Sequence, residues 1–143
     1  MPTLYFETDA REPCPIRFGG PTDSLVYFLS LAFATRYGAQ HDLSLLALLL
    51  RGEHKIDLGP LTTFADRDVE VAADARELER VWQDAAPLAE TLRRIVEALD
   101  AGDERIRELT AGAPGLRARL ADLGRMAAWA AERGARVRLS YDL

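Results

Sequence analysis

The sequence predicts an α+β fold in a single globular domain, residues 1–143, with a small sheet that includes both chain termini and four or five helices packed on it. Three observations lead to this prediction. Residues typical of strands fill Thr3 to Thr8 at the start of the chain, and apolar and polar residues alternate from Arg136 to Ser140 at its end. Between the two, apolar residues recur at helical spacing over most of residues 74–134. We therefore expect the two termini to lie near each other.

The most apolar segment runs from Ser24 to Thr35 without a single charge. A helix that is apolar on every side must be enclosed, and this segment is shorter than the roughly 20 residues that a membrane span needs. We expect a helix that opens after Gly19-Gly20-Pro21 and runs to about Tyr37, before Gly38. It would form the centre of a soluble core. If part of it were left uncovered, a homodimer would hide that part.

Shorter elements are predicted on both sides of the second apolar block. Pro15 to Phe18 and His54 to Leu58 are each interpreted as a short strand. Between them, Asp42 is predicted to cap a helix that Gly52 ends.

The segment from Asp68 to Ala72 alternates valines with acidic residues, which favours a half-buried strand. The same residues could instead begin a long helix. We prefer the strand, because Asp74 and Glu77 resemble a capping box that starts the helix at Asp74. Leu78, Val81 and Trp82 would then share one face of that helix.

The second half of the chain carries the strongest helical pattern. One apolar stripe consists of Leu88, Leu92, Ile95 and Leu99. Another, which ends before Gly134, consists of Leu116, Leu120, Leu123, Ala127 and Ala130. A short helix through Ile106 and Leu109 lies between them. Opposite charges four residues apart are predicted on the outer face of the first helix, namely Glu90 with Arg94 and Arg93 with Glu97.

Composition limits the function classes. Hydrophobic residues make up 48% of the chain and the net charge is −5, which is typical of a globular protein and disfavours nucleic-acid binding. Cys14 is the single cysteine, so no internal disulfide forms and a reducing compartment is indicated. The absence of a signal-peptide pattern and the arginine- and alanine-rich composition favour a bacterial, cytoplasmic protein with no membrane partner.

Motifs for nucleotide binding and nucleophilic catalysis are missing from the sequence, and we expect no cofactor. An alternative ligand or metal site would use His41 and His54 together with Asp57 and Cys14. Their spacing matches no compact zinc pattern, so we expect no metal. The chain is interpreted as non-enzymatic, and a small enzyme built on the two histidines is the alternative.

Aromatic residues offer a third route to function, a small-molecule sensor with an aromatic pocket near the uncharged helix. Core packing is the favoured role for most of them. The set is Tyr5, Phe6, Phe18, Tyr27, Phe28, Phe33, Tyr37, Phe64, Trp82, Trp129 and Tyr141.

The preferred hypothesis is a protein-interaction module, such as an immunity protein, an inhibitor or an accessory regulator. It rests on small size, negative charge and the lack of a catalytic motif. An acidic face would attract a basic protein partner, because opposite charges accelerate encounter. The candidates for this face are Glu70, Asp74, Glu77, Glu79 and Asp84, with Trp82 as an interface anchor.

Overall fold

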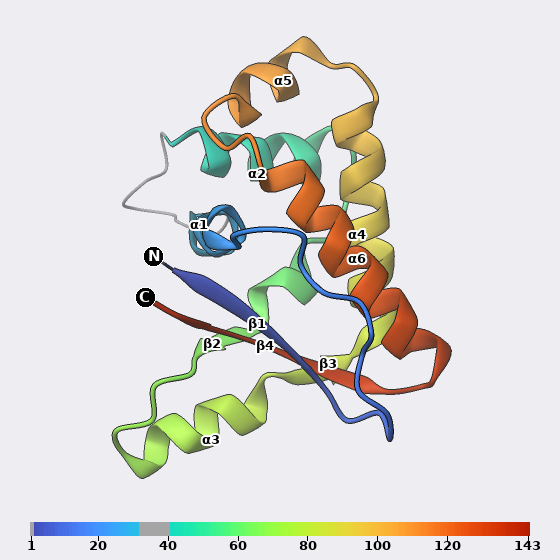
Figure 1. Cartoon of the computed structure of the whole chain (residues 1–143). Coiled ribbons are helices and arrows are strands. Elements are labelled where there is room, and N and C mark those ends of the chain that lie inside the picture. Colours follow the sequence, from blue (N-terminus) through green and yellow to red (C-terminus); the bar gives the residue numbers. More distant parts are fainter. Residues whose placement is uncertain (1, 32–40) are drawn as a thin grey trace.

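The computed structural model describes residues 2–31 and 41–143, and its four-stranded sheet is organised around the last strand (Figure 1). This strand, β4 (Arg136–Asp142), pairs antiparallel with β1 (Thr3–Thr8) along one edge. Its other edge is shared by two short strands, β2 (Phe64–Asp66), which is parallel to it, and β3 (Trp82–Asp84), which is antiparallel. In the β1–β4 register Thr3 lies opposite Asp142. The α+β fold, the two terminal strands and the proximity of the chain ends are thus confirmed.

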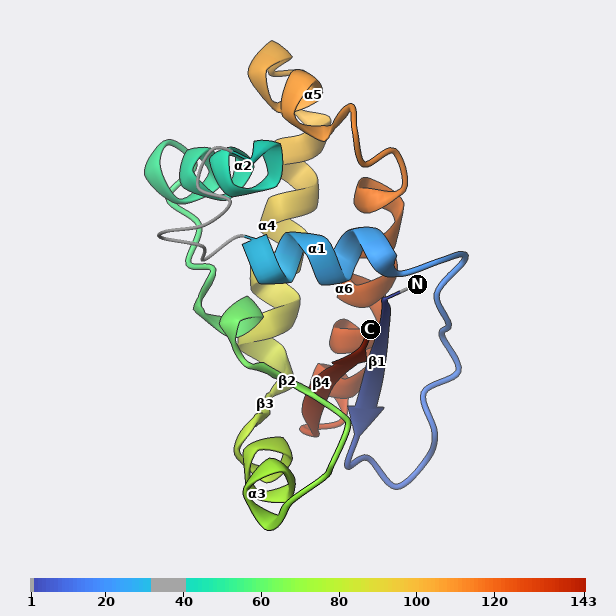
Figure 2. The ribbon, with the colours of Figure 1, turned by 90° about the vertical axis from the view of Figure 1, so that its left-hand side faces the viewer.

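Two helices form the wall behind the sheet, α4 (Ala85–Asp100) and α6 (Leu116–Glu132), which pack on each other along their length (Figure 1). Helix α1 (Asp23–Leu31) crosses them and also contacts β1 (Figure 2). At one end of the molecule α2 (Asp42–Gly52) packs on α5 (Glu104–Thr110).

At the opposite end α3 (Ala72–Arg80) projects next to β2, and a 3-10 turn, Gly59–Thr62, precedes that strand (Figure 1). The described residues thus contain six α-helices, one more than the upper limit predicted. None of the helices in this part of the chain is long and apolar enough to span a bilayer.

One core cluster joins both terminal strands to five of the six helices. Leu25, Val26, Phe28 and Leu29 of α1 are buried in it, so the chain itself covers this face of the apolar helix, whereas Tyr27 is 47% exposed. The predicted end of this helix at Tyr37 and Gly38 lies outside the described residues. The stripes on α4 and α6 are also confirmed, because all their members are buried except the half-buried Leu99.

Three predicted short strands are wrong, at Pro15 to Phe18, His54 to Leu58 and Asp68 to Ala72. The two short strands that do exist, β2 and β3, occupy successive stretches of the same β4 edge. A segment becomes a strand here only if the chain brings it to that edge, and the local pattern does not encode this. Val69 and Val71 do not face a core and are 52% and 59% exposed.

Helices α2 and α3 begin one and two residues before their predicted starts. The cap of α2 is His41, whose Nδ1 accepts the N–H of Leu43 at 3.1 Å, whereas Asp42 is the first helical residue. Helix α3 begins at Ala72. Asp74 lies in its first turn and accepts the N–H groups of Glu70 and Val71 at 3.0 and 3.2 Å. An acidic side chain one turn inside a helix can satisfy the free N–H groups before it, as well as a true cap can.

The end of α3 and the partners of two arginines on α4 also differ from the prediction. Helix α3 ends at Arg80, so Trp82 lies on β3 and not on a helical face. Arg93 pairs with Glu97 as predicted and also with Glu90 at 2.6 Å. Arg94 turns inward and donates to the carbonyl oxygens of His54 and Lys55 at 3.0 and 3.2 Å. It therefore anchors the segment after α2 to α4.

Candidate interaction surfaces

Five carboxylates gather on a projecting part of the molecule that we call the acidic arm, residues 64–80, formed by β2, α3 and the segment between them (Figure 1). They line a depression of about 450 Å³ together with Phe64 and Ala65. The five are Asp66, Asp68, Glu70, Asp74 and Glu77. The depression contains no basic lining residue, so it is a locally negative surface.

The carboxylates of the acidic arm have few partners. Asp66 accepts the N–H of Asp68 at 2.9 Å, and Asp74 accepts the two N–H groups that precede α3. Glu77 pairs with Arg80 at 3.0 Å in an exposed contact. Within the described ranges, no cationic side chain forms a salt bridge with the other four carboxylates.

Three of the predicted face residues lie elsewhere. Glu79 is on the side of α3 that meets the sheet, 3.5 Å from Arg138. Asp84 is the N-terminal flanking residue of α4. The ring of Trp82 lies under two arginines, with the Cζ atoms of Arg138 and Arg136 at 4.8 and 5.9 Å from its centroid. The structure therefore brings together Glu70, Asp74 and Glu77 of the predicted set.

Arginine stacked on aromatic rings covers the sheet face next to the acidic arm. Arg67 lies over Tyr5 at 3.7 Å, and the Tyr5 hydroxyl donates to Asp142 at 2.8 Å, which raises the pKa of Tyr5. Burial, together with the nearby Asp66 carboxylate, raises the pKa of Tyr141. Both tyrosines remain neutral at physiological pH.

The alternative ligand residues are spread over separate elements. His41 caps α2, and the carboxylate of Asp57 accepts the N–H of Gly59 in a turn. The Cys14 Sγ lies 3.7 Å from the carbonyl oxygen of Ile16, in the loop after β1. His54 follows α2, where its carbonyl oxygen binds Arg94. Across residues 2–31 and 41–143 no group of three or more His, Cys, Asp or Glu side chains is arranged to hold a metal ion.

A cavity of about 560 Å³ lies between α1, the start of α2 and the loop before α6, and Tyr27 is the one aromatic residue among the described residues that line it. Tyr27, which is 47% exposed, and His41 both line this cavity. Phe28 is fully buried, and Phe64 contacts Tyr141 with ring centroids 5.6 Å apart. Phe33 and Tyr37 lie outside the described residues.

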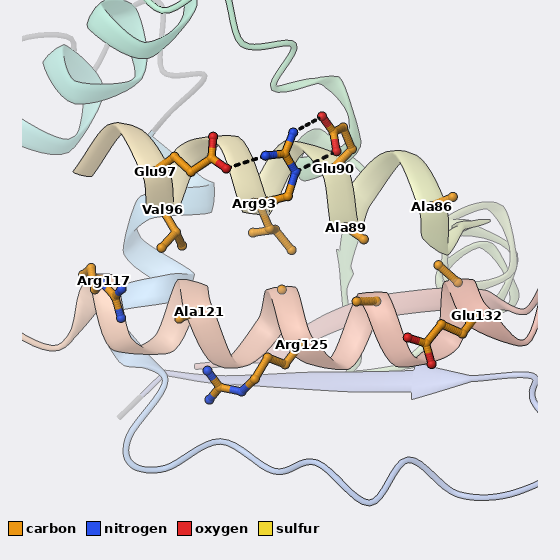
Figure 3. A pocket seen from close by; sticks show the side chains of 14 residues that line it. Ala86, Ala89, Glu90, Arg93, Val96, Glu97, Arg117, Ala121, Arg125 and Glu132 are labelled. Atoms are coloured by element: carbon orange, nitrogen blue, oxygen red, sulfur yellow. Dashed lines mark hydrogen bonds and ion pairs between the residues drawn. The ribbon is translucent and has the colours of Figure 1, made fainter. Parts of the chain in front are cut away.

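A groove between α4 and α6 was not predicted (Figure 3). It has a volume of about 600 Å³, and most of its apolar lining consists of small residues of the two helices. Charged side chains border it, and the bond from Arg93 lowers the pKa of Glu90 while the bond from Arg117 lowers the pKa of Asp100. The sequence did contain a signal, a second small-residue stripe next to each core stripe.

Comparison of the chain with protein-family models, with curated proteins and with solved structures gives no match. The function is therefore argued from the surfaces themselves.

Proposed function

We propose that this protein is a bacterial, cytoplasmic, non-enzymatic interaction module, of the immunity, inhibitor or accessory-regulator kind, and that the acidic arm binds a basic protein partner. The observation that carries the proposal is the depression lined by five carboxylates, four of which have no cationic partner among the described residues. The acidic arm contains six acidic residues and three arginines, so it holds −3 of the chain's net charge of −5.

Two further features of the acidic arm support a macromolecular partner. Val69 and Val71 are more than half exposed beside the carboxylates, and they offer apolar contact area. Helix α3 buries none of its residues, so its surface is available for contact. A negative patch of this kind would steer a positively charged partner and accelerate its association.

The test compares the wild type with the double variant Asp68→Lys/Glu70→Lys as bait in an extract of the cells that express the protein. Both side chains are exposed, so the variant keeps the fold. We expect quantitative mass spectrometry to find a protein with a basic surface that the wild type enriches and the variant does not. Its association rate, measured by stopped flow, should fall about tenfold or more in the variant and should decrease as salt is added.

The matched control is Glu104→Lys/Glu108→Lys on α5, which changes the net charge equally at two exposed positions far from the acidic arm in the fold (Figure 1). It should bind the partner at nearly the wild-type rate. Equal loss of binding in both variants would mean that only overall charge matters. Retention of the partner by the Asp68→Lys/Glu70→Lys variant would refute the acidic arm as the binding surface.

A further inference from the structure

Helices α4 and α6 each carry a second apolar stripe that the core covers only in part, since Ala89, Val96 and Ala131 stay half-buried. On α4 the inner stripe of Leu88, Leu92 and Ile95 is buried, and next to it runs an outer stripe. The outer positions are Ala86, Ala89 and Val96 on α4, and Ala121, Gly124, Ala128 and Ala131 on α6. They recur at spacings of three and four, with Arg93 completing the α4 series, which is the pattern of a helix that packs on two sides.

The outer stripes face each other across the groove and form its floor and walls (Figure 3). This side of the helix pair lies away from the sheet and from α1 (Figures 1 and 2). Because the side chains on this surface are small, the axis of another helix could come within about 8 Å of the axes of α4 and α6. The groove is thus suited to helix packing and holds no cluster of convergent polar groups for a small ligand.

The charges that border the groove indicate which helices would fit. The α4 border has two carboxylates and one guanidinium, from Glu90, Glu97 and Arg93, whereas the α6 border has the opposite balance, from Arg117, Arg125 and Glu132. Glu97 and Arg117 lie at the same end of the groove on opposite helices (Figure 3). A two-fold axis along the groove would place α4 of one copy over α6 of the other, and Glu97 opposite Arg117.

From this self-complementary arrangement we infer that the occupant of the groove is a second copy of this chain, which forms a two-fold symmetric homodimer through an α4–α6 four-helix contact. The contact uses a surface remote from the acidic arm, so it is independent of the proposed function. It also differs from a dimer through the uncharged helix, because the chain itself already buries Leu25, Val26, Phe28 and Leu29 of α1.

Sedimentation equilibrium of the full chain over a concentration series tests the dimer. We expect the wild type to reach twice the chain mass of 15.8 kDa. Ala128→Glu places a carboxylate at an exposed position in the groove, and it should raise the dissociation constant at least tenfold. The control Ala73→Glu makes the same change at an exposed position of α3 and should leave the dissociation constant unchanged.

Circular dichroism decides whether each variant is folded. If Ala128→Glu loses helical signal, Ala86→Glu replaces it, because this position is exposed in the first turn of α4, where a negative charge favours the helix. A wild type that stays monomeric up to about 1 mM overturns the inference and leaves the groove to a helix from another protein. A dimer that both groove variants retain also overturns it.

A charge exchange tests the orientation of the two copies. Arg117→Glu alone should weaken the dimer, since two carboxylates would face each other across the interface. Because it also removes the bond from Arg117 to Asp100 of the same chain, the control is Asp100→Asn, which weakens that bond and should leave the dimer intact. Adding Glu97→Lys to Arg117→Glu should recover at least half of the loss in association free energy. Failure of the second change to recover association would exclude the two-fold arrangement.

Discussion

At the scale of single residues, Asp122 on α6 is the most connected carboxylate in the described structure. It is 6% exposed, its Oδ2 accepts the N–H of Gly19 at 2.9 Å, and it pairs with Arg119 at 3.1 Å and with Arg125 through its other oxygen. A Cβ on Gly20 would come within 2.4 Å of the Arg119 guanidinium, so any other residue there would require Arg119 to shift. The network ties the loop after β1 to the helical wall.

Replacing this carboxylate tests the network. Asp122→Ala should lower the free energy of unfolding by about 3 to 5 kcal/mol, because it leaves the largely buried Arg119 guanidinium without its carboxylate and removes the acceptor of the Gly19 N–H. Urea denaturation followed by circular dichroism measures the change. The matched control is Glu104→Gln, which removes an exposed ion pair with Arg107 and should leave the stability nearly unchanged. A loss below about 1 kcal/mol in Asp122→Ala would contradict the structural role of the network.

At the scale of elements, an exposed arginine links α5 to the end of α2. The carboxylate of Asp103 accepts the N–H of Arg105 at 2.9 Å and so caps α5. The Arg105 guanidinium reaches both Asp103, at 2.9 Å, and Glu53, at 2.5 Å. Its bonds lower the pKa of Asp103, with help from the capping N–H, and lower the pKa of Glu53.

The sign of the pH dependence follows from these lowered pKa values. Arg105→Gln should raise the pKa of Asp103 and of Glu53 toward their ordinary values, which NMR titration of the carboxyl carbons measures. A carboxyl whose pKa is lowered by folding stabilises the protein above its unfolded pKa, and this contribution disappears as the pH falls through the folded pKa. The variant should therefore be slightly less stable than the wild type near pH 7 and equal to it in strong acid. Unchanged carboxyl pKa values in Arg105→Gln would show that the bridge does not form in solution.

At the scale of the whole molecule, the fold depends on β4, which is bonded on both edges and whose Val137 and Leu139 are fully buried. The acidic arm contrasts with it, since α3 buries no residue and is joined to the sheet through β2 and β3. Few buried contacts mean a low free energy of local opening. The structure thus combines a stable centre with a weakly supported arm.

Native-state hydrogen exchange measures this difference directly. The amides of Val137 and Leu139 should exchange only through global unfolding. The free energy of opening measured at these amides should therefore equal the free energy of unfolding of the whole domain. Amides in the last two turns of α3, such as those of Glu77 and Leu78, should exchange at least about 100-fold faster through local opening. Equal protection in α3 and β4 would mean that the acidic arm unfolds only with the core.

Sequence by itself determined the helices and strands in which the spacing of apolar residues repeats over several helical turns or several strand positions. Leu88, Leu92 and Ile95 follow the helical period, and Val137 and Leu139 follow the strand period, so a single core face is specified locally. The acidic residues Glu70, Asp74 and Glu77 were identified for the same reason, as a dense local run.

Only the tertiary structure decided which segments became short strands and which side chains share a surface. Three residues at Phe64 to Asp66 form a strand because β4 offers them an edge, whereas the better pattern at Asp68 to Ala72 finds no edge and stays exposed. Likewise Asp66 lies beside the carboxylates of α3, whereas Asp84 lies apart from them at the start of α4. The direction that the chain takes after each turn decides both positions. The physical reason is that periodicity is a property of neighbours in sequence, whereas an edge, a depression or a groove requires partners distant in it.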